Sequence, residues 1–101
     1  MLIKFIPFNG TAPAGKLAEV ALHFTSGELA GLKLVGFAIW ERRGGTGRNV
    51  TFPARSYTVN GDRRTFALLR PDGEVADAQN RLRDEILAAY DLYLETDAGR
   101  Q

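Results

Sequence analysis

Residues 29–41, LAGLKLVGFAIWE, form the longest apolar run of the chain and decide its fold. In a strand, Leu34 and Trp40 of this run share one face, and Phe37 and Ile39 share the other. A strand with two apolar faces is covered on both sides, so we expect it near the centre of a sheet. The two glycines of the run argue against a helix and indicate a bend, a bulge or a close backbone approach.

Shorter strand patterns flank this run. Residues 2–8 are rich in β-forming side chains, and Pro7 predicts an edge strand or a strand end because proline cannot donate to a ladder. Residues 16–25 alternate between two faces, which is typical of a half-buried strand. Two further strands are predicted at 49–54 and 64–69, and an Asn-Gly-Asp sequence before the last one indicates a hairpin turn.

From about Glu74 the apolar residues recur at three- and four-residue steps, which predicts a helix, with Asp72 as its N-cap. The last residues, about 96–101, are expected to fray. Strands followed by a helix define the α+β class. We therefore expect a single domain, 1–101, in which about five antiparallel strands form one curved sheet and one long C-terminal helix packs on or beside it.

The composition excludes several kinds of protein. The chain has no cysteine, which excludes a disulfide framework, a thiolate metal site and a thiol nucleophile. The N-terminal residues do not resemble a signal peptide, and no apolar run approaches the roughly 20 residues of a membrane span. We expect a soluble, cytoplasmic protein with no membrane partner.

Positive charge is concentrated in the middle of the chain. Between Arg42 and Arg70 there are seven arginines and one acid, a net charge of +6, whereas the remainder holds six basic and eleven acidic residues. Such asymmetry indicates a surface that faces an anion, although charge placement also serves solubility alone.

The sequence ERRGGTGRN at 41–49 places three arginines around three glycines. A phosphate-binding P-loop needs Gly, four residues and then Gly-Lys-Ser/Thr, between a strand and a helix. No Lys-Ser/Thr follows here, and the next element is a strand. The glycines are suited to the positive φ of a hairpin tip. We expect this tip to contact phosphates as well, through Arg42, Arg43 and Arg48 and through its backbone amides.

Aromatic residues interleave with these arginines, as in proteins that stack bases beside a basic groove. We expect Phe37, Phe52 and Phe66 to belong to the core. Trp40 and Tyr57 lie nearer to strand ends and are the candidates for base stacking.

Catalytic and metal sites have little support in the sequence. His23 is the only histidine, and without a second histidine or a cysteine it does not build an ordinary zinc site. No serine or aspartate stands in an obvious supporting role for general-base catalysis. We expect no catalytic residue, no metal, no cofactor and no small-molecule substrate.

The order of these features resembles the SpoVG family of septation proteins over about residues 2–94. The resemblance rests on the segments GKLAEVALHF, GFAIWE, VTFPAR, RRTFALLRP and RLRDEILAAY in this order. Its most telling part is the glycine turn that runs from Gly47 into a strand ending at Phe52-Pro53. No single motif is diagnostic, and the spacing of all of them carries the likeness.

The resemblance implies a small, dimeric bacterial protein that binds DNA and RNA, regulates gene expression and lacks catalytic activity. Arg55 matches the basic residue after the family's proline, and Arg81 and Arg83 match a region implicated in nucleic-acid contact. The chain departs from the family in its acidic DGEVAD segment, in Arg70 where histidine is common, and in its more basic glycine turn. The contact surface is therefore expected nearer to the hairpin, and neither a sequence preference nor a sporulation role carries over.

Two functional hypotheses remain open from the sequence. The first is sequence-tolerant nucleic-acid binding by a homodimer, with affinity supplied mainly by phosphate neutralisation. The second is a protein-interaction module of cell division or gene regulation, in which the arginines only solvate the surface. The candidate nucleic-acid-binding residues are Arg42, Arg43, Arg48, Arg55, Arg63, Arg64, Arg70, Arg81 and Arg83.

Overall fold

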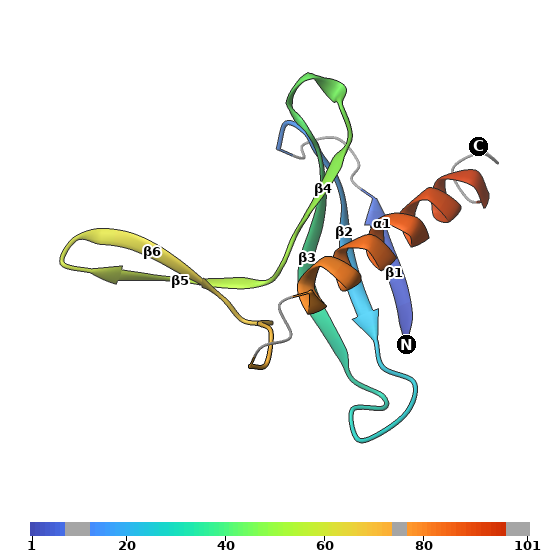
Figure 1. The fold of residues 1–101 in the computed structure, drawn as a ribbon, viewed down its shortest axis with the longest axis horizontal. Helices are drawn as coiled ribbons and strands as arrows, with labels where there is room; N and C mark the ends of the chain where they lie inside the picture. Colours follow the sequence, from blue (N-terminus) through green and yellow to red (C-terminus); the bar gives the residue numbers. More distant parts are fainter. Residues whose placement is uncertain (8–12, 74–76, 97–101) are drawn as a thin grey trace.

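The computed structural model describes residues 1–7, 13–73 and 77–96, which adopt an α+β fold (Figure 1). One antiparallel sheet has the strand order β1-β2-β3-β4. Its strands are β1 (Leu2–Pro7), β2 (Lys16–His23), β3 (Lys33–Glu41) and β4 (Arg48–Thr51). A second antiparallel sheet consists of β5 (Ala54–Val59) and β6 (Asp62–Ala67), and the helix α1 (Ala78–Thr96) follows. The α+β class, the antiparallel strands and the C-terminal helix are confirmed, whereas the single five-stranded sheet is wrong.

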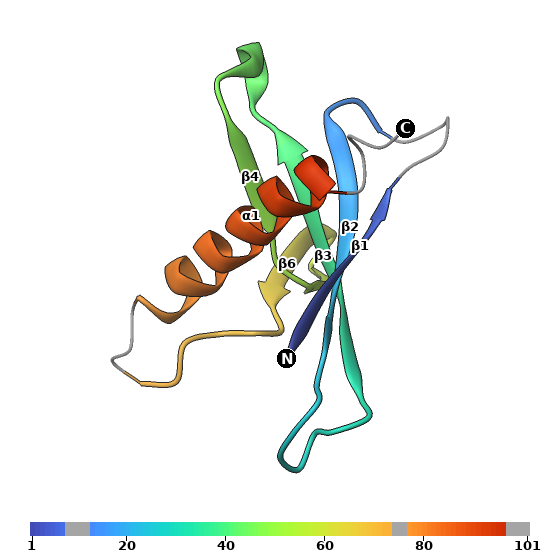
Figure 2. The same cartoon turned by 90° about the vertical axis from the view of Figure 1, so that its right-hand side faces the viewer.

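The core lies between α1 and one face of the four-stranded sheet (Figure 2). Ile86 and Tyr90 of the helix are buried in one hydrophobic cluster with Phe37 and Ile39 of β3. Phe5 of β1 contacts the ring of Tyr90 edge-on, with 5.4 Å between the ring centroids. The helix is therefore held by its apolar stripe, and β1 is an edge strand, as Pro7 predicts.

The central strand β3 is shorter and less covered than its sequence suggests. It begins at Lys33, because residues 24–32 form a hairpin loop in which the amide of Gly31 donates to Phe24 O at 3.0 Å. Its middle, from Phe37 to Ile39, is buried, whereas Val35 is 55% exposed. The prediction of cover on both faces therefore holds only for the middle of the strand.

Gly36 and Pro53 explain why the strands split into two sheets. The β3–β4 register ends with Ala38 opposite Thr51, so its continuation brings Gly36 opposite Pro53. Pro53 has no N–H to extend the ladder, and a Cβ on Gly36 would lie 2.9 Å from the Pro53 Cβ. Gly36 also has φ +108°, which side chains rarely adopt. The chain leaves the sheet at this point and enters β5, a strand that the sequence pattern did not separate from the turn after it.

The start of α1 differs from the sequence prediction. The helix begins at Ala78, and the backbone carbonyl of Asp77 accepts a hydrogen bond from the Arg81 amide at 2.9 Å. Asp77 thus occupies the N-cap position, and Asp72 as N-cap is wrong, because the helix begins six residues after it, at Ala78. The expected start near Glu74 lies outside the described residues. The same holds for the expected fraying of 96–101, apart from Thr96, which ends α1.

Candidate nucleic-acid interface

The glycine-rich segment forms the tip of the β3–β4 hairpin, as predicted. Glu41 pairs with Arg48 across the strands, and the amide of Arg42 donates to Gly47 O at 2.8 Å. Gly44, Gly45 and Gly47 all have positive φ, between +71° and +131°. The tip therefore needs its glycines for backbone reasons, and a strand follows it where a P-loop requires a helix.

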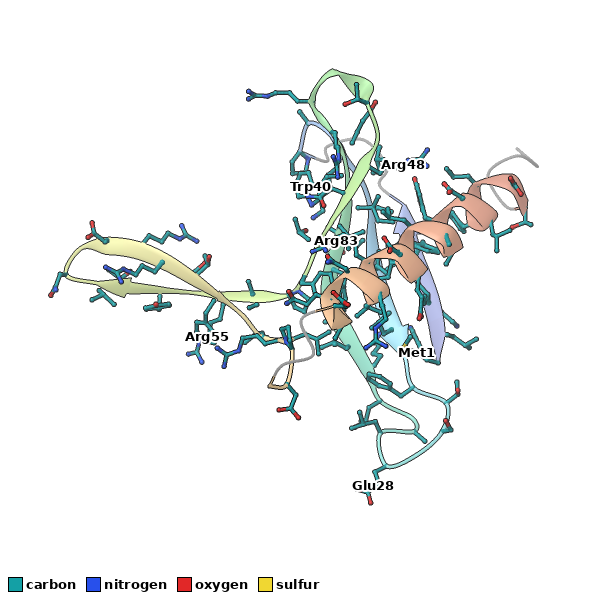
Figure 3. The ribbon with its side chains drawn as sticks, in the orientation of Figure 1. Met1, Glu28, Trp40, Arg48, Arg55 and Arg83 are labelled. Carbon is teal, nitrogen blue, oxygen red and sulfur yellow. The ribbon has the colours of Figure 1, made fainter. Side chains whose placement is uncertain are left out.

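The three arginines of the tip have different surroundings. Arg42 and Arg43 are exposed to solvent. Arg48 is half-buried and points toward the helix, where its Nη1 donates to Asp91 Oδ1 at 2.8 Å (Figure 3). Its guanidinium also lies 5.1 Å from the centre of the Tyr90 ring. Arg42 and Arg43 are thus free to meet an anion from solvent, whereas Arg48 already has a carboxylate partner.

An open hollow of about 440 Å³ lies between this tip and α1. Glu41, Arg48, Tyr90 and Asp91 contribute polar groups to its wall. Two carboxylates and one paired guanidinium leave no excess positive charge there. The hollow does not suit a phosphate group, so phosphate contacts at this end are expected on the outer side of the tip.

Removing the Arg48 side chain is expected to lower the free energy of unfolding by about 1–2 kcal/mol. This figure combines a solvent-exposed ion pair with a cation–π contact, each contributing up to about 1 kcal/mol. Urea denaturation of Arg48→Ala, Asp91→Asn and the double variant measures it as a double-mutant cycle. Additive effects of the two single substitutions would contradict the coupling that the 2.8 Å contact implies.

The titration of Tyr90 is expected to make the stability of the folded protein depend on pH in the alkaline range. Burial raises the pKa of the Tyr90 phenol above its usual value, and the Arg48 charge partly opposes the shift. Because the pKa is raised in the folded state, the neutral Tyr90 phenol contributes its full stability below the unfolded pKa of about 10. That contribution is lost as pH rises through the folded pKa. Wild type is therefore expected to lose more stability than Tyr90→Phe above about pH 10. Urea midpoints between about pH 8 and pH 11 measure the difference, and parallel curves for the two proteins would refute it.

The second sheet is an arm that projects away from the four-stranded sheet and α1 (Figure 1). Its turn is Asn60-Gly61, with φ +51° and +84°, as expected for the tight turn of a two-residue hairpin. The hairpin turn predicted at these residues is confirmed. Every residue of β5 and β6 is exposed except Ala67, which is half-buried. The arm thus presents both faces and both edges to solvent.

The register of the arm decides which side chains share a face. Arg55 lies opposite Phe66, and Tyr57 lies opposite Arg64. Because directly opposite residues project to the same side, these two arginines and two rings form one face. Tyr57 and Phe66 are in edge contact, with 5.7 Å between their centroids. Arg63 belongs to the other face, where its Nη2 donates to Ser56 Oγ at 3.5 Å.

Phe66 does not belong to the core, contrary to the sequence prediction. Its side chain is 39% exposed, because β6 pairs only with β5 and no other element among the described residues covers this face. Phe37 is buried and Phe52 is half-buried beside it, as predicted, with 5.1 Å between the two ring centroids. The sequence contained a signal for this difference: ARSYTV and DRRTFA carry polar residues on both strand faces, which is unusual in a sheet that covers a core.

The remaining candidate arginines lie at the base of the arm and at the start of α1. Arg70 and Arg83 both border Phe52, Arg70 through a small apolar hollow and Arg83 with its guanidinium 5.2 Å from the ring centroid. Arg83 also donates to Asn80 Oδ1 at 2.7 Å, and Arg81 is exposed. Arg70 and Arg83 thus lie beside Phe52, two residues before β5 begins, although α1 follows the arm in sequence.

Trp40 lies on β3 and not on the arm. Its indole Nε1 donates to Thr51 Oγ1 at 2.9 Å, and the Lys16 ammonium is 5.6 Å from its ring centroid (Figure 3). Base stacking by Trp40 stays a prediction, while Tyr57 is the better exposed of the two rings that the sequence singled out.

Two other kinds of site find no support in the part of the chain that the structure describes. Within 1–7, 13–73 and 77–96, no three His, Cys, Asp or Glu side chains gather in a way that suits a metal ion. Over the same ranges, no helix combines the length and the apolar character required to cross a membrane.

The site is therefore defined as a basic tip and a basic, aromatic arm on an α+β fold. No family model, curated protein or solved structure gives a significant match to this chain.

Proposed function

We propose that this chain is a non-catalytic nucleic-acid-binding protein that regulates gene expression as a cytoplasmic homodimer. It contacts DNA or RNA phosphates through the β3–β4 tip and the β5–β6 arm. It requires no cofactor, metal or small-molecule substrate. The resemblance to the SpoVG family supports the same class of function.

The exposure and charge of the arm carry this proposal. Three of its four charged side chains are arginines, Arg55, Arg63 and Arg64, and all of them face solvent. A thin ribbon that carries cations on both faces follows a phosphate backbone more readily than a flat surface does, and phosphate contacts supply most of the affinity in sequence-tolerant binding. Arg42 and Arg43 add a second basic projection on the adjacent hairpin.

The dimer is supported by apolar surface on the four-stranded sheet. Leu2 and Ile6 lie on the face of β1 that points away from the core and are 53% and 56% exposed. A chain of 101 residues buries a modest share of its surface alone, so self-association through this face of the sheet would remove apolar area from water. Two copies would also double the number of phosphate contacts.

The proposal is tested by fluorescence anisotropy with labelled single-stranded and duplex DNA and RNA over a salt series. With about three to four phosphate contacts per protomer, the dimer is expected to show a log–log salt slope of about −5 to −7 on duplex DNA. No binding to any of these nucleic acids at low salt would refute the proposal.

The two kinds of tip arginine are expected to behave differently in this assay. Arg42→Ala with Arg43→Ala removes two exposed cations and is expected to weaken binding by about 10-fold and to flatten the salt slope. Arg48→Ala is the matched control for each single change, Arg42→Ala or Arg43→Ala, which is expected to cost about 3-fold. Because the Arg48 guanidinium already pairs with Asp91, its removal is expected to change affinity clearly less than either of them. A larger loss of affinity for Arg48→Ala than for the double variant would indicate that the binding surface lies in the hollow beside α1.

A protein-interaction module is the second candidate. The observation that favours it is the same exposed apolar surface, Leu2 and Ile6 on β1, together with Val35 on β3 at 55% exposure. Sedimentation of wild type and Ile6→Lys tests whether this surface binds protein. If Ile6→Lys yields a monomer and no nucleic acid binds to either protein, the interaction module becomes the better account.

A further inference from the structure

The face of the arm that carries Tyr57 and Phe66 has the composition of a base-stacking surface. Tyr57 is 41% exposed and Phe66 is 39% exposed, so both rings offer area to a ligand although they touch each other. Val59 extends the apolar strip toward the turn at 37% exposure. Stacking of bases on such rings is tolerant of sequence because every base has a flat π-face.

The arginines are placed so that each ring has a cation as its direct cross-strand neighbour. Arg55 stands opposite Phe66, and Arg64 stands opposite Tyr57. Directly opposite residues have Cβ atoms about 4.5–5.5 Å apart, so a base on either ring has a guanidinium within reach of its own phosphate. The face therefore contains two pairs of a ring and an arginine. In one pair the arginine is on β5 and the ring is on β6, and in the other pair the positions are exchanged.

An isolated two-stranded hairpin is marginally stable in water, and this one exposes its rings and both of its edges. An occupant that covers the rings would thus stabilise the arm as well as bind to it. The charge of the face indicates what this occupant is. Two guanidiniums and one carboxylate, that of Asp62, favour an anionic ligand.

A second copy of the arm fits this face poorly. Symmetric face-to-face packing of two arms would bring Arg55 and Arg64 of both copies into one interface, and like charges placed opposite one another are destabilising. A duplex also fits poorly, because its bases are stacked inside the helix and offer only hydrogen-bonding edges in the grooves. The rings of Phe66 and Tyr57 contribute mainly apolar surface to this face.

We propose that this face binds two unpaired nucleotides of a single-stranded DNA or RNA, with one base on Tyr57, one base on Phe66, and their phosphates at Arg64 and Arg55. This inference rests on the proposed nucleic-acid binding and specifies its ligand as single-stranded. The shared chemistry is an unpaired base with its phosphate, which DNA and RNA both supply.

The test compares wild type with Tyr57→Leu/Phe66→Leu, which removes the rings and keeps all arginines. Anisotropy is measured with a single-stranded oligonucleotide, its duplex, and a strand of the same length whose bases are removed. Wild type is expected to bind the intact strand at least about 30-fold more tightly than the baseless strand, since each stacked base contributes substantially to affinity. The double leucine variant is expected to lose most of this preference with an unchanged salt slope. Tyr57→Phe/Phe66→Tyr is the control that keeps both rings and is expected to bind like wild type.

The outcomes separate this inference from the proposal on which it rests. Equal affinity of wild type for the intact and the baseless strand, with a steep salt dependence, would overturn the stacking inference and leave phosphate binding intact. This comparison needs no variant, so a leucine variant that fails to fold does not leave the inference untested. Failure of wild type to bind any strand would refute the proposed function itself.

The leucine variant offers two further ways to overturn the inference. The first is that it folds and keeps its preference for the intact strand. The second is that it changes the oligomeric state and leaves strand affinity unaltered, because the face would then be a protein interface.

Discussion

Replacing Arg55 and Arg64 together by glutamate is expected to weaken nucleic-acid binding by at least about 100-fold. Hydrogen bonds to charged groups contribute about 1.5–3 kcal/mol each, so the removal of two phosphate-binding arginines accounts for about two orders of magnitude. The new carboxylates add repulsion from the phosphates. The salt slope on a single strand is also expected to flatten by about 0.7 for each phosphate that is no longer neutralised. Anisotropy over a salt series measures both quantities.

A charge-matched control distinguishes a local contact from a general effect of net charge. Lys4 on β1 and Lys33 at the start of β3 are exposed and lie on the four-stranded sheet. Replacing both by glutamate changes the net charge by the same amount as the arm variant. Both lysines lie on the sheet face proposed for the dimer, so sedimentation first checks that this variant keeps the oligomeric state of wild type. With that state unchanged, the control is expected to weaken binding by only a few-fold, through long-range electrostatics. Equal losses in the two variants would show that the arm is not the contact surface.

Gly36→Ala is expected to lower the free energy of unfolding by about 3 kcal/mol or more, the largest effect of an alanine substitution among the glycines that the structure describes. The added Cβ would meet the Pro53 Cβ at 2.9 Å, and φ at this residue is +108°. Backbone strain of this kind and overpacking each cost about 1–3 kcal/mol. Small domains have about 5–15 kcal/mol in total, so the loss is a large fraction of the stability. Urea denaturation measures it.

Gly27→Ala is the matched control for this substitution. Gly27 also has a positive φ, +75°, but a Cβ there would meet no atom within 4 Å. It is expected to cost about 1 kcal/mol, the cost of the left-handed conformation alone. Adding Pro53→Gly to Gly36→Ala removes the clashing Cβ and is expected to cost less than the sum of the two single changes. Equal losses at Gly27 and Gly36 would contradict the close approach to Pro53.

The sequence predicted those parts of the fold that depend on local patterns. The Asn60-Gly61 turn, the glycine tip and the edge strand with Pro7 all follow from the backbone needs of single residues. The division into two sheets does not. Pro53 marks a strand end in sequence, but the direction that the chain takes afterwards depends on Gly36, which lies 17 residues earlier and approaches Pro53 only in the folded protein.

The candidate site was predictable in composition and less so in arrangement. The sequence identified the arginines and Tyr57, because clustered charge and aromatic residues are visible in one dimension. It did not reveal that Arg48 turns toward Asp91, which is 43 residues away in sequence, and it assigned Phe66 to the core. The exposure of Phe66 follows from the separation of the arm from the sheet, so the error about the site has the same physical origin as the error about the fold.

The β5–β6 arm and the β3–β4 tip are the proposed points of contact with nucleic acid. The most direct measurement is an NMR titration of ¹⁵N-labelled protein with a short single-stranded oligonucleotide, read as amide shift changes along the chain. We expect the largest changes within residues 54–67 and 42–47. Changes concentrated on β1 or on the middle of α1, or no changes at low salt, would contradict this expectation.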